Sequence, residues 1–215
     1  MRAMFETIAP RYDFITRVFS YGMDMNWKRV ALAGARLPEG ARILDLACGT
    51  GDFSRLAAEQ GAAAVSADLT AGMLREAPDL PCRACADAHS LPFADASFDA
   101  VFIGYGVRNF TELPQALKEI RRVLKPGGRL VTLDFFQPRN AVWRELFIGW
   151  LYFQGGLWGL ILHGKPSIYT YIPRSLRTFL SNESYSSALE AAGFQPSRIK
   201  RFLGGGISIH WSARR

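Results

Sequence analysis

The residues with the clearest chemical potential lie between positions 42 and 54, where the sequence reads RILDLACGTGDFS. A short apolar run precedes Gly49 and Gly51, and a helical pattern starts at Asp52 and continues to Gln60. This order predicts a strand buried on both faces, a tight turn and a helix, the opening unit of a doubly wound α/β sheet. The glycines would let a ligand approach the backbone, and the helix N-terminus would present free N–H groups to it.

The composition of the turn limits the kind of ligand. A dinucleotide fingerprint has a third glycine that allows close packing of helix on strand, but Ser54 stands at that position. Asp45 lies near the end of the predicted strand, where its carboxylate could meet an amino group. We therefore expect a ligand other than a dinucleotide. A turn that only joins strand to helix is the simpler alternative.

Two more aspartates follow predicted strands. Asp68 ends the strand over 63–68, where a carboxylate can accept hydrogen bonds from a ribose diol. Asp87 follows the strand over 82–86 and is placed to accept a hydrogen bond from an adenine amino group. A cap or turn role is the alternative for Asp87. Both residues point to a nucleoside at the carboxyl edge of the sheet.

The composition is that of a globular protein rather than a fibrous or disordered one. The 215 residues suffice for one domain with an ample core, with 49% apolar and 21% charged residues. A net charge of +7 favours anionic partners such as a membrane surface. The arginines are scattered, however, so a nucleic-acid groove is not indicated. Glu6 and Asp13 among the first apolar residues argue against a signal or an anchor.

The three cysteines indicate a reducing cytoplasm, because their number is odd. Cys82 and Cys85 have a spacing that also occurs in zinc and redox sites. No second Cys or His pair lies at metal-binding spacing, so we expect two buried thiols in or near a strand and no metal.

The rest of the chain predicts an alternation of strands and helices framed by helical segments. A helical cap over 4–36, with Asp24 capping its second helix, precedes a core over 41–137. The final section over 188–215 contains a helix and two strands, and the short connection at 204–206 requires these strands to be antiparallel. The expected elements are helices over 52–60, 71–77 and 112–124 and strands over 43–47, 63–68, 82–86, 97–104, 129–136, 198–203 and 206–213.

Residues 138–187 interrupt this alternation with an apolar stretch. Apolar residues recur at helical spacing from position 143, and no charged residue occurs over 146–162. The stretch is marginally short for a membrane span, and Gly155 with Gly156 predicts a break in the helix. We expect an apolar wall or lid suited to a greasy substrate or to shallow contact with a bilayer. An ordinary pair of core helices is the alternative.

Several strings carry a resemblance to a known family. LDLACGTG at 44–51 resembles motif I of the class I methyltransferases, which bind S-adenosylmethionine (SAM). Together with this string, four others resemble the UbiE/MenG family, the quinone-ring C-methyltransferases of menaquinone and ubiquinone biosynthesis. These strings are APRYD at 9–13, GVRN at 106–109, YIPRSLRTF at 171–179 and GGISIH at 205–210. The resemblance implies one class I methyltransferase domain over 1–215, with a Rossmann-like, mostly parallel seven-stranded sheet and an antiparallel C-terminal strand.

The resemblance also implies which residues bind SAM. Gly104 stands where many members carry serine, which leaves only backbone to contact the cofactor there. Asp134 stands where the family usually has glutamate. The implied SAM-binding residues are Asp45, Gly49, Thr50, Gly51, Asp68, Leu69, Asp87, Ala88 and Gly104.

Three residues are candidates for catalysis of ring methylation. Arg108 would stabilise the phenolate that makes a ring carbon nucleophilic, because arginine keeps its charge and is not expected to act as a base. Asn109 would orient a ring oxygen, and Tyr12 would pack on the ring or hydrogen-bond to it. A water or a nearby Asp or His would carry the proton. A salt bridge is the structural alternative for Arg108, and for His210 a structural role is favoured over that of a base.

The resemblance favours SAM-dependent methylation of a polyprenylated quinol, with demethylmenaquinol as the substrate. The alternatives are the equivalent benzoquinol in ubiquinone biosynthesis, another small apolar acceptor, and a SAM-binding subunit without catalysis. A nucleic-acid methyltransferase is disfavoured, because no Asn-Pro-Pro-Tyr-type string and no basic stripe occur. We expect a cytoplasmic protein with transient peripheral contact at the inner face of the membrane, and a homodimer is left open.

Overall fold

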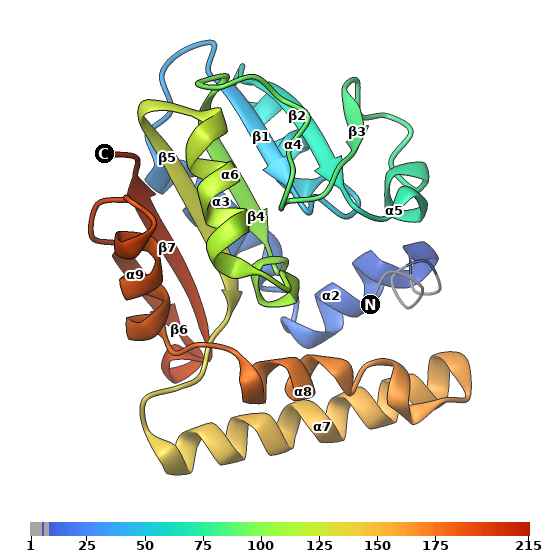
Figure 1. Ribbon diagram of the computed structural model, residues 1–215. Coiled ribbons are helices and arrows are strands. Elements are labelled where there is room, and N and C mark those ends of the chain that lie inside the picture. Colours follow the sequence, from blue (N-terminus) through green and yellow to red (C-terminus); the bar gives the residue numbers. More distant parts are fainter. Residues whose placement is uncertain (1–5, 7–8) are drawn as a thin grey trace.

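The computed structural model describes residue 6 and residues 9–215, and its centre is a seven-stranded sheet (Figure 1). The start of the predicted helical cap, at residues 4–5 and 7–8, lies outside the described residues. The strands are β1 (Arg42–Leu46), β2 (Ala63–Asp68), β3 (Arg83–Cys85), β4 (Phe98–Gly104), β5 (Leu124–Phe135), β6 (Arg198–Phe202) and β7 (Ile207–Ala213). The helices are α2 (Tyr12–Phe19), α3 (Asp24–Ala35), α4 (Asp52–Ala58), α5 (Ala71–Arg75), α6 (Leu113–Val123), α7 (Ala141–His163), α8 (Tyr171–Thr178) and α9 (Asn182–Ala191). Short 3₁₀ turns are η1 (Ala9–Arg11), η2 (Val107–Asn109), η3 (Pro166–Ile168) and η4 (Leu203–Gly205).

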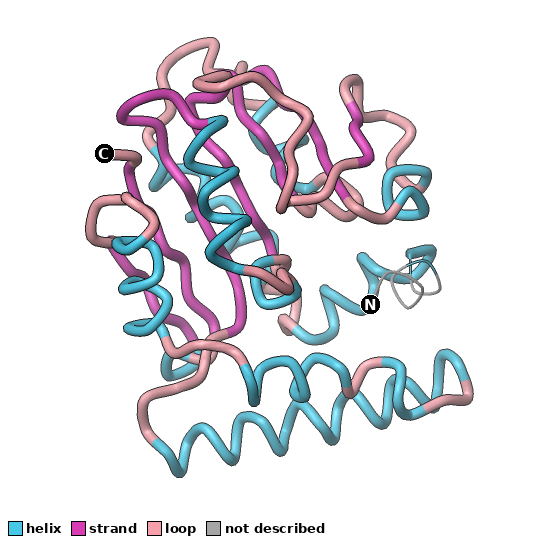
Figure 2. The backbone as a smooth tube through the Cα atoms, viewed as in Figure 1, coloured by secondary structure: helices cyan, strands magenta, loops and turns pink. Residues whose placement is uncertain are grey.

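The strand order places a topological switch between β1 and β4. Across the sheet, whose strands are magenta in Figure 2, the order is β3-β2-β1-β4-β5-β7-β6, and β7 runs opposite to the other six described strands. This confirms the predicted α/β fold with an antiparallel C-terminal strand. Ligands of doubly wound sheets bind outside the carboxyl ends of the strands at such a switch. The ends of β1, β2 and β4 are therefore where a ligand is expected.

Helices cover both faces of the sheet, which explains why its central strands are apolar almost throughout. Ile43 faces a core shared with α3 and α4, while its neighbour Leu44 faces the opposite core, which α6 and α9 close. The predicted helices over 52–60, 71–77 and 112–124 are confirmed, with ends shifted by one or two residues.

The main difference within the sheet concerns β5, which begins at Leu124 rather than at residue 129. Its pairing register with β4 shifts between Phe98 and Ala100, so the additional residues of β5 pass through an irregularity. A local pattern of Pro and Gly predicts a turn there, and only the long-range pairing with β4 extends the strand.

The N-terminal helices α2 and α3 meet at a sharp bend. Tyr21 and Gly22 have φ angles of 53° and 74°, which ends α2 where the sequence predicts a break. The predicted capping role of Asp24 is wrong, because Asp24 is already the first helical residue and its side chain makes no cap hydrogen bond. Its carboxylate instead accepts a hydrogen bond from Ser20 Oγ at 3.0 Å.

The long helix α7 runs for 23 residues without interruption, so the predicted break at Gly155 and Gly156 is wrong. Gly155, together with Gly159 one turn later, serves close packing instead. A Cβ on Gly159 would lie 2.7 Å from the carbonyl oxygen of Lys165, and a Cβ on Gly155 would lie 3.0 Å from that of Tyr169. The segment that connects α7 to α8 through η3 therefore packs directly against α7 at Gly155 and Gly159.

This packing predicts opposite effects for two neighbouring glycines. Gly159→Ala should destabilise the protein by about 1–3 kcal/mol, because its methyl group would overlap backbone atoms. Gly156→Ala meets nothing within 4 Å and should stabilise α7 by up to about 1 kcal/mol, as alanine does in helix interiors. Urea unfolding of both variants measures the difference, and equal midpoints would show that the close return of the chain is not tight.

Candidate active site

A cavity of about 200 Å³ lies at the carboxyl ends of β1, β2 and β4. Its walls come from the turn after β1, the residues after β2 and β3, and the loop that follows β4. We call it the cofactor cleft. Eight of the predicted site residues line it, namely Tyr12, Gly49, Asp68, Leu69, Asp87, Ala88, Gly104 and Asn109.

Asp68 ties the glycine turn to the end of β2. Its Oδ2 accepts a hydrogen bond from Gly49 N at 2.9 Å, and its Oδ1 accepts one from Thr70 N at 2.8 Å. Gly49 and Gly51 have φ angles of 56° and 88°, the left-handed region that favours glycine. Burial raises the pKa of Asp68. Each carboxylate oxygen can still accept a second hydrogen bond, so Asp68 can serve a ligand as well as the turn.

Asp45 lies beneath the turn and not in the cleft. It is 1% exposed, and its Oδ2 accepts hydrogen bonds from Ser54 N and Ser54 Oγ, each at 2.9 Å. The Ser54 hydroxyl also lies 2.6 Å from Ser66 Oγ on β2. Burial raises the pKa of Asp45 to about 7. Ser54, at the third fingerprint position, therefore links α4 to β1 and β2 through hydrogen bonds. Asp45 is the residue of β1 that accepts two of these bonds.

Thr50 and Gly51 also lie behind the turn rather than in the cleft wall. The Thr50 hydroxyl donates to Asp13 Oδ1 of α2 at 2.5 Å. A Cβ on Gly51 would lie 2.3 Å from Leu80 Cδ1, which leaves no room for a side chain. Thr50 and Gly51 therefore fix the turn without lining the cavity, whereas Gly49 lines it.

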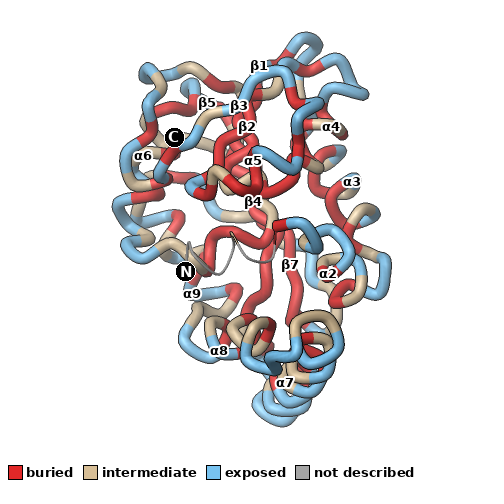
Figure 3. Tube along the Cα trace, turned by 90° about the vertical axis from the view of Figure 1, so that its right-hand side faces the viewer, coloured by how far each residue is buried: buried red, intermediate tan, exposed pale blue. Residues whose placement is uncertain are grey.

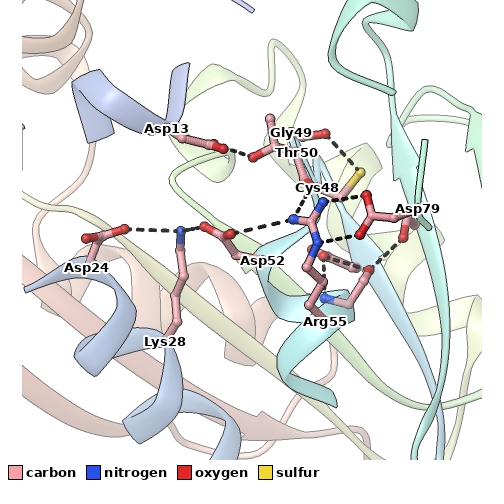
Figure 4. A network of polar contacts seen from close by, with 12 residues as sticks. Asp13, Asp24, Lys28, Cys48, Gly49, Thr50, Asp52, Arg55 and Asp79 are labelled. Atoms are coloured by element: carbon pink, nitrogen blue, oxygen red, sulfur yellow. Dashed lines mark hydrogen bonds and ion pairs between the residues drawn. The ribbon is translucent and has the colours of Figure 1, made fainter. Parts of the chain in front are cut away.

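A chain of charges fastens the N-terminal helices to this turn (Figure 4). Lys28 of α3 is buried, with its Nζ 2.5 Å from Asp52 Oδ2 and 3.7 Å from Asp24 Oδ2. Arg55 of α4 forms a bidentate pair with Asp79, with N···O distances of 2.7 and 2.8 Å. The helices that precede the sheet are thus held by ion pairs against the element that forms the cleft.

Asp87 lines the cleft and also makes the turn that was its alternative role. Its Oδ1 accepts from His89 N at 2.9 Å and contacts His89 Nδ1 at 2.5 Å. His89 Nε2 accepts from Glu112 N at 3.2 Å, so the ring proton lies on Nδ1 and is donated to Asp87. The hydrogen bond from the His89 backbone is the largest contribution that lowers the pKa of Asp87.

A second, smaller cavity of about 30 Å³ adjoins the cleft, and we call it the aromatic cavity. Tyr12 and Tyr105 line both cavities. The remaining wall is mostly apolar and aromatic, and Arg108 is the one cation among the described residues that line it. The other lining residues are Ile15, Thr16, Phe19, Ser20, Phe135, Tyr169, Tyr171 and Ile172.

Arg108 is held in a buried ion pair with Asp134. The two side chains are 2% and 0% exposed, and Arg108 Nη1 donates to Asp134 Oδ1. Arg108 Nη1 also donates to the carbonyl oxygen of Tyr105 at 3.2 Å, and the guanidinium carbon lies 5.0 Å from the centre of the Phe135 ring. Within the described part of the chain, Arg108 Nε has no hydrogen-bond partner. Arg108 therefore forms the salt bridge that was its structural alternative, and it also lines the aromatic cavity.

Asn109 has spare hydrogen-bonding capacity at the same place. Its Nδ2 donates to the carbonyl oxygen of Tyr105 at 3.5 Å, while its buried Oδ1 has no partner among the residues that the structure describes. Asn109 lines the cofactor cleft, and its neighbour Arg108 lines the aromatic cavity. The string GVRN therefore contributes Gly106 and Asn109 to the cleft and Arg108 to the aromatic cavity.

The sequence predicts Tyr12, which lines both cavities, but not the other tyrosines around it, Tyr105 and Tyr171 among them. Tyr105 has a φ of 58° directly after β4, and its side chain forms the shared wall. Tyr171 comes from α8, far away in the sequence. Tyr105 follows a strand end, which is a usable signal, but nothing local distinguishes Tyr171 from a core tyrosine.

His210 is a structural residue. It is 0% exposed, its Nε2 lies 3.0 Å from Asn182 Oδ1, and burial lowers its pKa to about 3. It lines neither cavity.

The prediction of buried thiols is wrong for Cys82 and Cys85, which are exposed because β3 is an edge strand. Among residue 6 and residues 9–215, no group of three His, Cys, Asp or Glu residues could hold a metal ion.

Comparison with known proteins identifies the family. A model described as the ubiE/COQ5 methyltransferase family matches residues 1–214. The chain belongs to this family. It is 43% identical to a demethylmenaquinone methyltransferase of Thermus thermophilus, with 96% of this chain and 98% of the relative covered. It is 38% identical to the ubiquinone/menaquinone biosynthesis C-methyltransferase UbiE of Geotalea uraniireducens, with coverages of 97% and 93%.

Solved structures share the fold at low sequence identity. A SAM-dependent methyltransferase of Thermotoga maritima aligns with a TM-score of 0.74 at 19% identity, covering 100% of both chains. An N-methyltransferase of Haemonchus contortus, solved with S-adenosylhomocysteine, aligns with a TM-score of 0.64 at 16% identity, covering 88% of this chain and 52% of that one. The protein is therefore a SAM-dependent methyltransferase with the class I fold.

The cleft has the chemistry that SAM requires. SAM carries a sulfonium and an ammonium, and the carboxylates of Asp68 and Asp87 place negative charge along the cleft. Leu69, Ala88 and Phe110 provide apolar surface for an adenine ring. The left-handed turn exposes backbone to close approach, as a ligand lying along the strand ends needs.

This geometry predicts that Asp68→Asn weakens SAM binding about tenfold or more, because a neutral amide replaces a charged acceptor. Isothermal titration calorimetry measures the affinity. Asp79→Asn, which changes an exposed aspartate that pairs with Arg55 outside the cleft, is the matched control and should leave it unchanged. An Asp68→Asn protein with wild-type affinity would remove Asp68 from the cofactor site.

Asp45 predicts a pH dependence of stability. Its pKa in the folded protein is about 7 and lies above its ordinary value of 3.8, so its protonated form is favoured by folding. The stabilisation is complete below pH 3.8 and is lost as the pH rises through about 7, with a slope of up to about 1.4 kcal/mol per pH unit. Asp45→Asn should remove this slope. Urea unfolding at several pH values measures it, and parallel stability curves for both proteins would contradict it.

Proposed function

We propose that this enzyme methylates a ring carbon of a polyprenylated quinol, with demethylmenaquinol as its substrate. The observation that carries the proposal is the buried Arg108 in an aromatic cavity that shares two walls with the cofactor cleft. The relatives support it, because several that match along most of their length are named demethylmenaquinone methyltransferase. The equivalent benzoquinol is the second candidate, since the name of another relative includes ubiquinone biosynthesis.

The cofactor roles follow from the positions of the residues. We propose that Asp68 accepts from the ribose hydroxyls and Asp87 from the adenine amino group, while Gly49, Leu69, Ala88 and Gly104 line the cleft. The other three implied residues shape the turn from behind, and these are Asp45, Thr50 and Gly51.

SAM supplies a methyl group on a sulfonium, which is already a good electrophile. The protein must therefore supply a nucleophilic ring carbon in line with the S–CH₃ bond. A quinol carbon becomes nucleophilic when the adjacent hydroxyl loses its proton, and the guanidinium of Arg108 stabilises the negative charge on that oxygen. When the new C–C bond forms, the C–S bond breaks, and the ring carbon then releases its hydrogen as a proton to restore aromaticity.

The protons leave to water in this scheme. Within the described part of the chain, no carboxylate and no imidazole lines the aromatic cavity. Burial raises the pKa values of Tyr12, Tyr105 and Tyr171, so these phenols act as neutral groups that pack on the ring or donate to its oxygens. We assign Asn109 to orienting a ring oxygen through its unpartnered Oδ1 or its amide group.

The acceptor must displace protein to enter. A cavity of about 30 Å³ holds about one water, which is far less than a quinol ring. Helix α2 supplies Tyr12, Ile15 and Phe19 to this cavity, and α8 supplies Ile172. We propose that the segment over 4–36 acts as a cap and the segment over 138–187 as a lid, and that α2 and α8 move apart to admit the ring while the Lys28–Asp52 ion pair keeps α3 in place. The enzyme would meet its substrate on the cytoplasmic side of the membrane.

A methyl-transfer assay tests the proposed function. Purified enzyme with methyl-labelled SAM and matched short-chain naphthoquinol and benzoquinol acceptors should label the naphthoquinol ring, with a kcat/KM about tenfold or more above that for the benzoquinol. A preference for the benzoquinol would reassign the substrate. Labelling of neither acceptor would reject quinol methylation.

The role of Arg108 has its own test. Arg108→Ala would leave Asp134 buried without a partner, at a cost of about 3–5 kcal/mol, so the double variant Arg108→Gln with Asp134→Asn is preferable. Its kcat should fall by about 10²-fold or more with SAM affinity retained, because the charge that stabilises the phenolate is gone. Asp134→Asn alone keeps the guanidinium but removes its buried partner, at a similar cost of about 3–5 kcal/mol, so this control is compared as folded protein checked by circular dichroism, and its kcat should fall much less. A double variant as active as wild type would exclude Arg108 from catalysis.

A further inference from the structure

The outward side of α7 is an exposed apolar surface, which we call the α7 face. The opposite side of the helix is buried against the rest of the protein through Phe147, Ile148 and Leu151. Trp143 contacts Leu203 and Trp150 contacts Tyr21, but the α7 face is otherwise open among the described residues, and the helix forms one edge of the molecule (Figure 1, Figure 3). Its exposed residues are Val142, Trp143, Leu146, Trp150, Phe153, Leu157, Leu160 and Ile161, between 41% and 71% exposed.

These residues form one continuous stripe, because most of them recur every three or four positions along the helix. At 1.5 Å per residue, 23 residues extend about 35 Å. By length and composition, α7 is also long and apolar enough to cross a membrane. However, a third of its most apolar 18-residue stretch is buried against the rest of the protein. A helix that packs along one side against its own domain can lie in the plane of an interface and cannot at the same time cross it.

The segments that contain and adjoin the α7 face are positively charged, which favours an anionic binding partner. Residues 9–21 and 138–180, which contain α2, α7 and α8, carry seven Lys and Arg against two carboxylates. That is five of the seven net positive charges of the whole chain. An anionic lipid surface complements this distribution, whereas a second copy of the chain would bring two positively charged rims together.

The α7 face is continuous with the element that closes the aromatic cavity. Phe14 of α2 packs edge-to-face on Trp158, with ring centres 5.8 Å apart, and Arg11 donates to the carbonyl oxygen of Leu162. The hydroxyl of Tyr21 accepts from Trp150 Nε1. Helix α2 therefore rests on α7 with one side and lines the cavity with the other.

We propose that the α7 face docks on the surface of an anionic bilayer, with α7 lying in the interface beneath the mouth of the aromatic cavity. Tryptophans such as Trp143 and Trp150 favour this depth, and arginines at the rim meet lipid phosphates. The purpose of the docking rests on the proposed function, since a quinol with a long prenyl tail remains in the bilayer while its ring enters the cavity. The docking itself is independent of the reaction.

Vesicle flotation of the full-length protein tests the docking. The probes are vesicles of equal parts phosphatidylglycerol and phosphatidylcholine, and vesicles of phosphatidylcholine alone. Wild-type protein should float with the anionic vesicles and be released by high salt. The variant Leu146→Glu with Phe153→Glu should bind about tenfold or more weakly. The matched control is Ala58→Glu with Gln60→Glu, which adds the same charge at exposed positions of α4 and the turn after it and should bind as wild type.

Each other outcome overturns the proposal. Equal flotation of the α7 variant and wild type would remove the α7 face from lipid binding, as would wild-type protein that ignores both vesicles. Release by detergent but not by salt would indicate a spanning helix. A dimer that the α7 substitutions dissociate in analytical ultracentrifugation, without a change in flotation, would assign the face to a second copy. Turnover of a short-chain, water-soluble naphthoquinol should be unchanged in the variant, so loss of docking and loss of the proposed function are read separately.

Discussion

The acceptor side of the active site depends on one buried ion pair, Arg108 with Asp134. Removing two charges from water is costly, and the cost is offset only if each charge finds a close partner with further hydrogen bonds. The sheet provides this, because the pairing of Gly104 with Leu133 brings the carboxyl ends of β4 and β5 side by side. Arg108 is thereby held in the wall of the aromatic cavity, next to Asn109 in the wall of the cleft.

The donor side is built on a different principle. There, carboxylates fix backbone: Asp68 accepts from two amide groups, and Asp45 fixes the first turn of α4 through Ser54. These bonds hold a left-handed turn that would be costly without them. The structure thus combines a glycine turn fixed by hydrogen bonds with an aromatic cavity lined by α2 and α8, and the ion pair of Lys28 with Asp52 joins α3 to the helix that follows the turn.

The sequence predicts the sheet well because its signals are local. An apolar run, a glycine turn and a helical period specify β1 and α4 within 20 residues, and the aspartates at the strand ends follow from the same pattern. The unbroken course of α7 and the exposure of Cys82 and Cys85 depend on neighbours that are remote in the sequence. Gly155 and Gly159 of α7 leave room for the segment around η3, which follows later in the chain. Strand β3 lies at an edge only because the strand order of the whole sheet places it there.

The candidate site was predictable to the same extent and for the same reason. Residues next to strand ends were found, and so was Tyr12 of α2 through the resemblance of its string, while Tyr171 of α8 was not, since tyrosine in an amphipathic helix looks the same in a core and in a cavity. Asp45 illustrates the converse. Its place in the string indicated a ligand contact, yet a serine three residues beyond Gly51 captures its carboxylate.

The floor of the cofactor cleft shows how volume is shared between two elements. A Cβ on Gly104 would lie 3.1 Å from the ring of Phe53, which itself packs on Phe102 with ring centres 5.1 Å apart. A serine at position 104 would therefore press on the Phe53 ring, which must move by a few tenths of an ångström to admit it. The glycine at the end of β4 thus leaves room for the large ring at position 53 of α4, and a side chain added on the strand is accommodated by a shift of the helix residue.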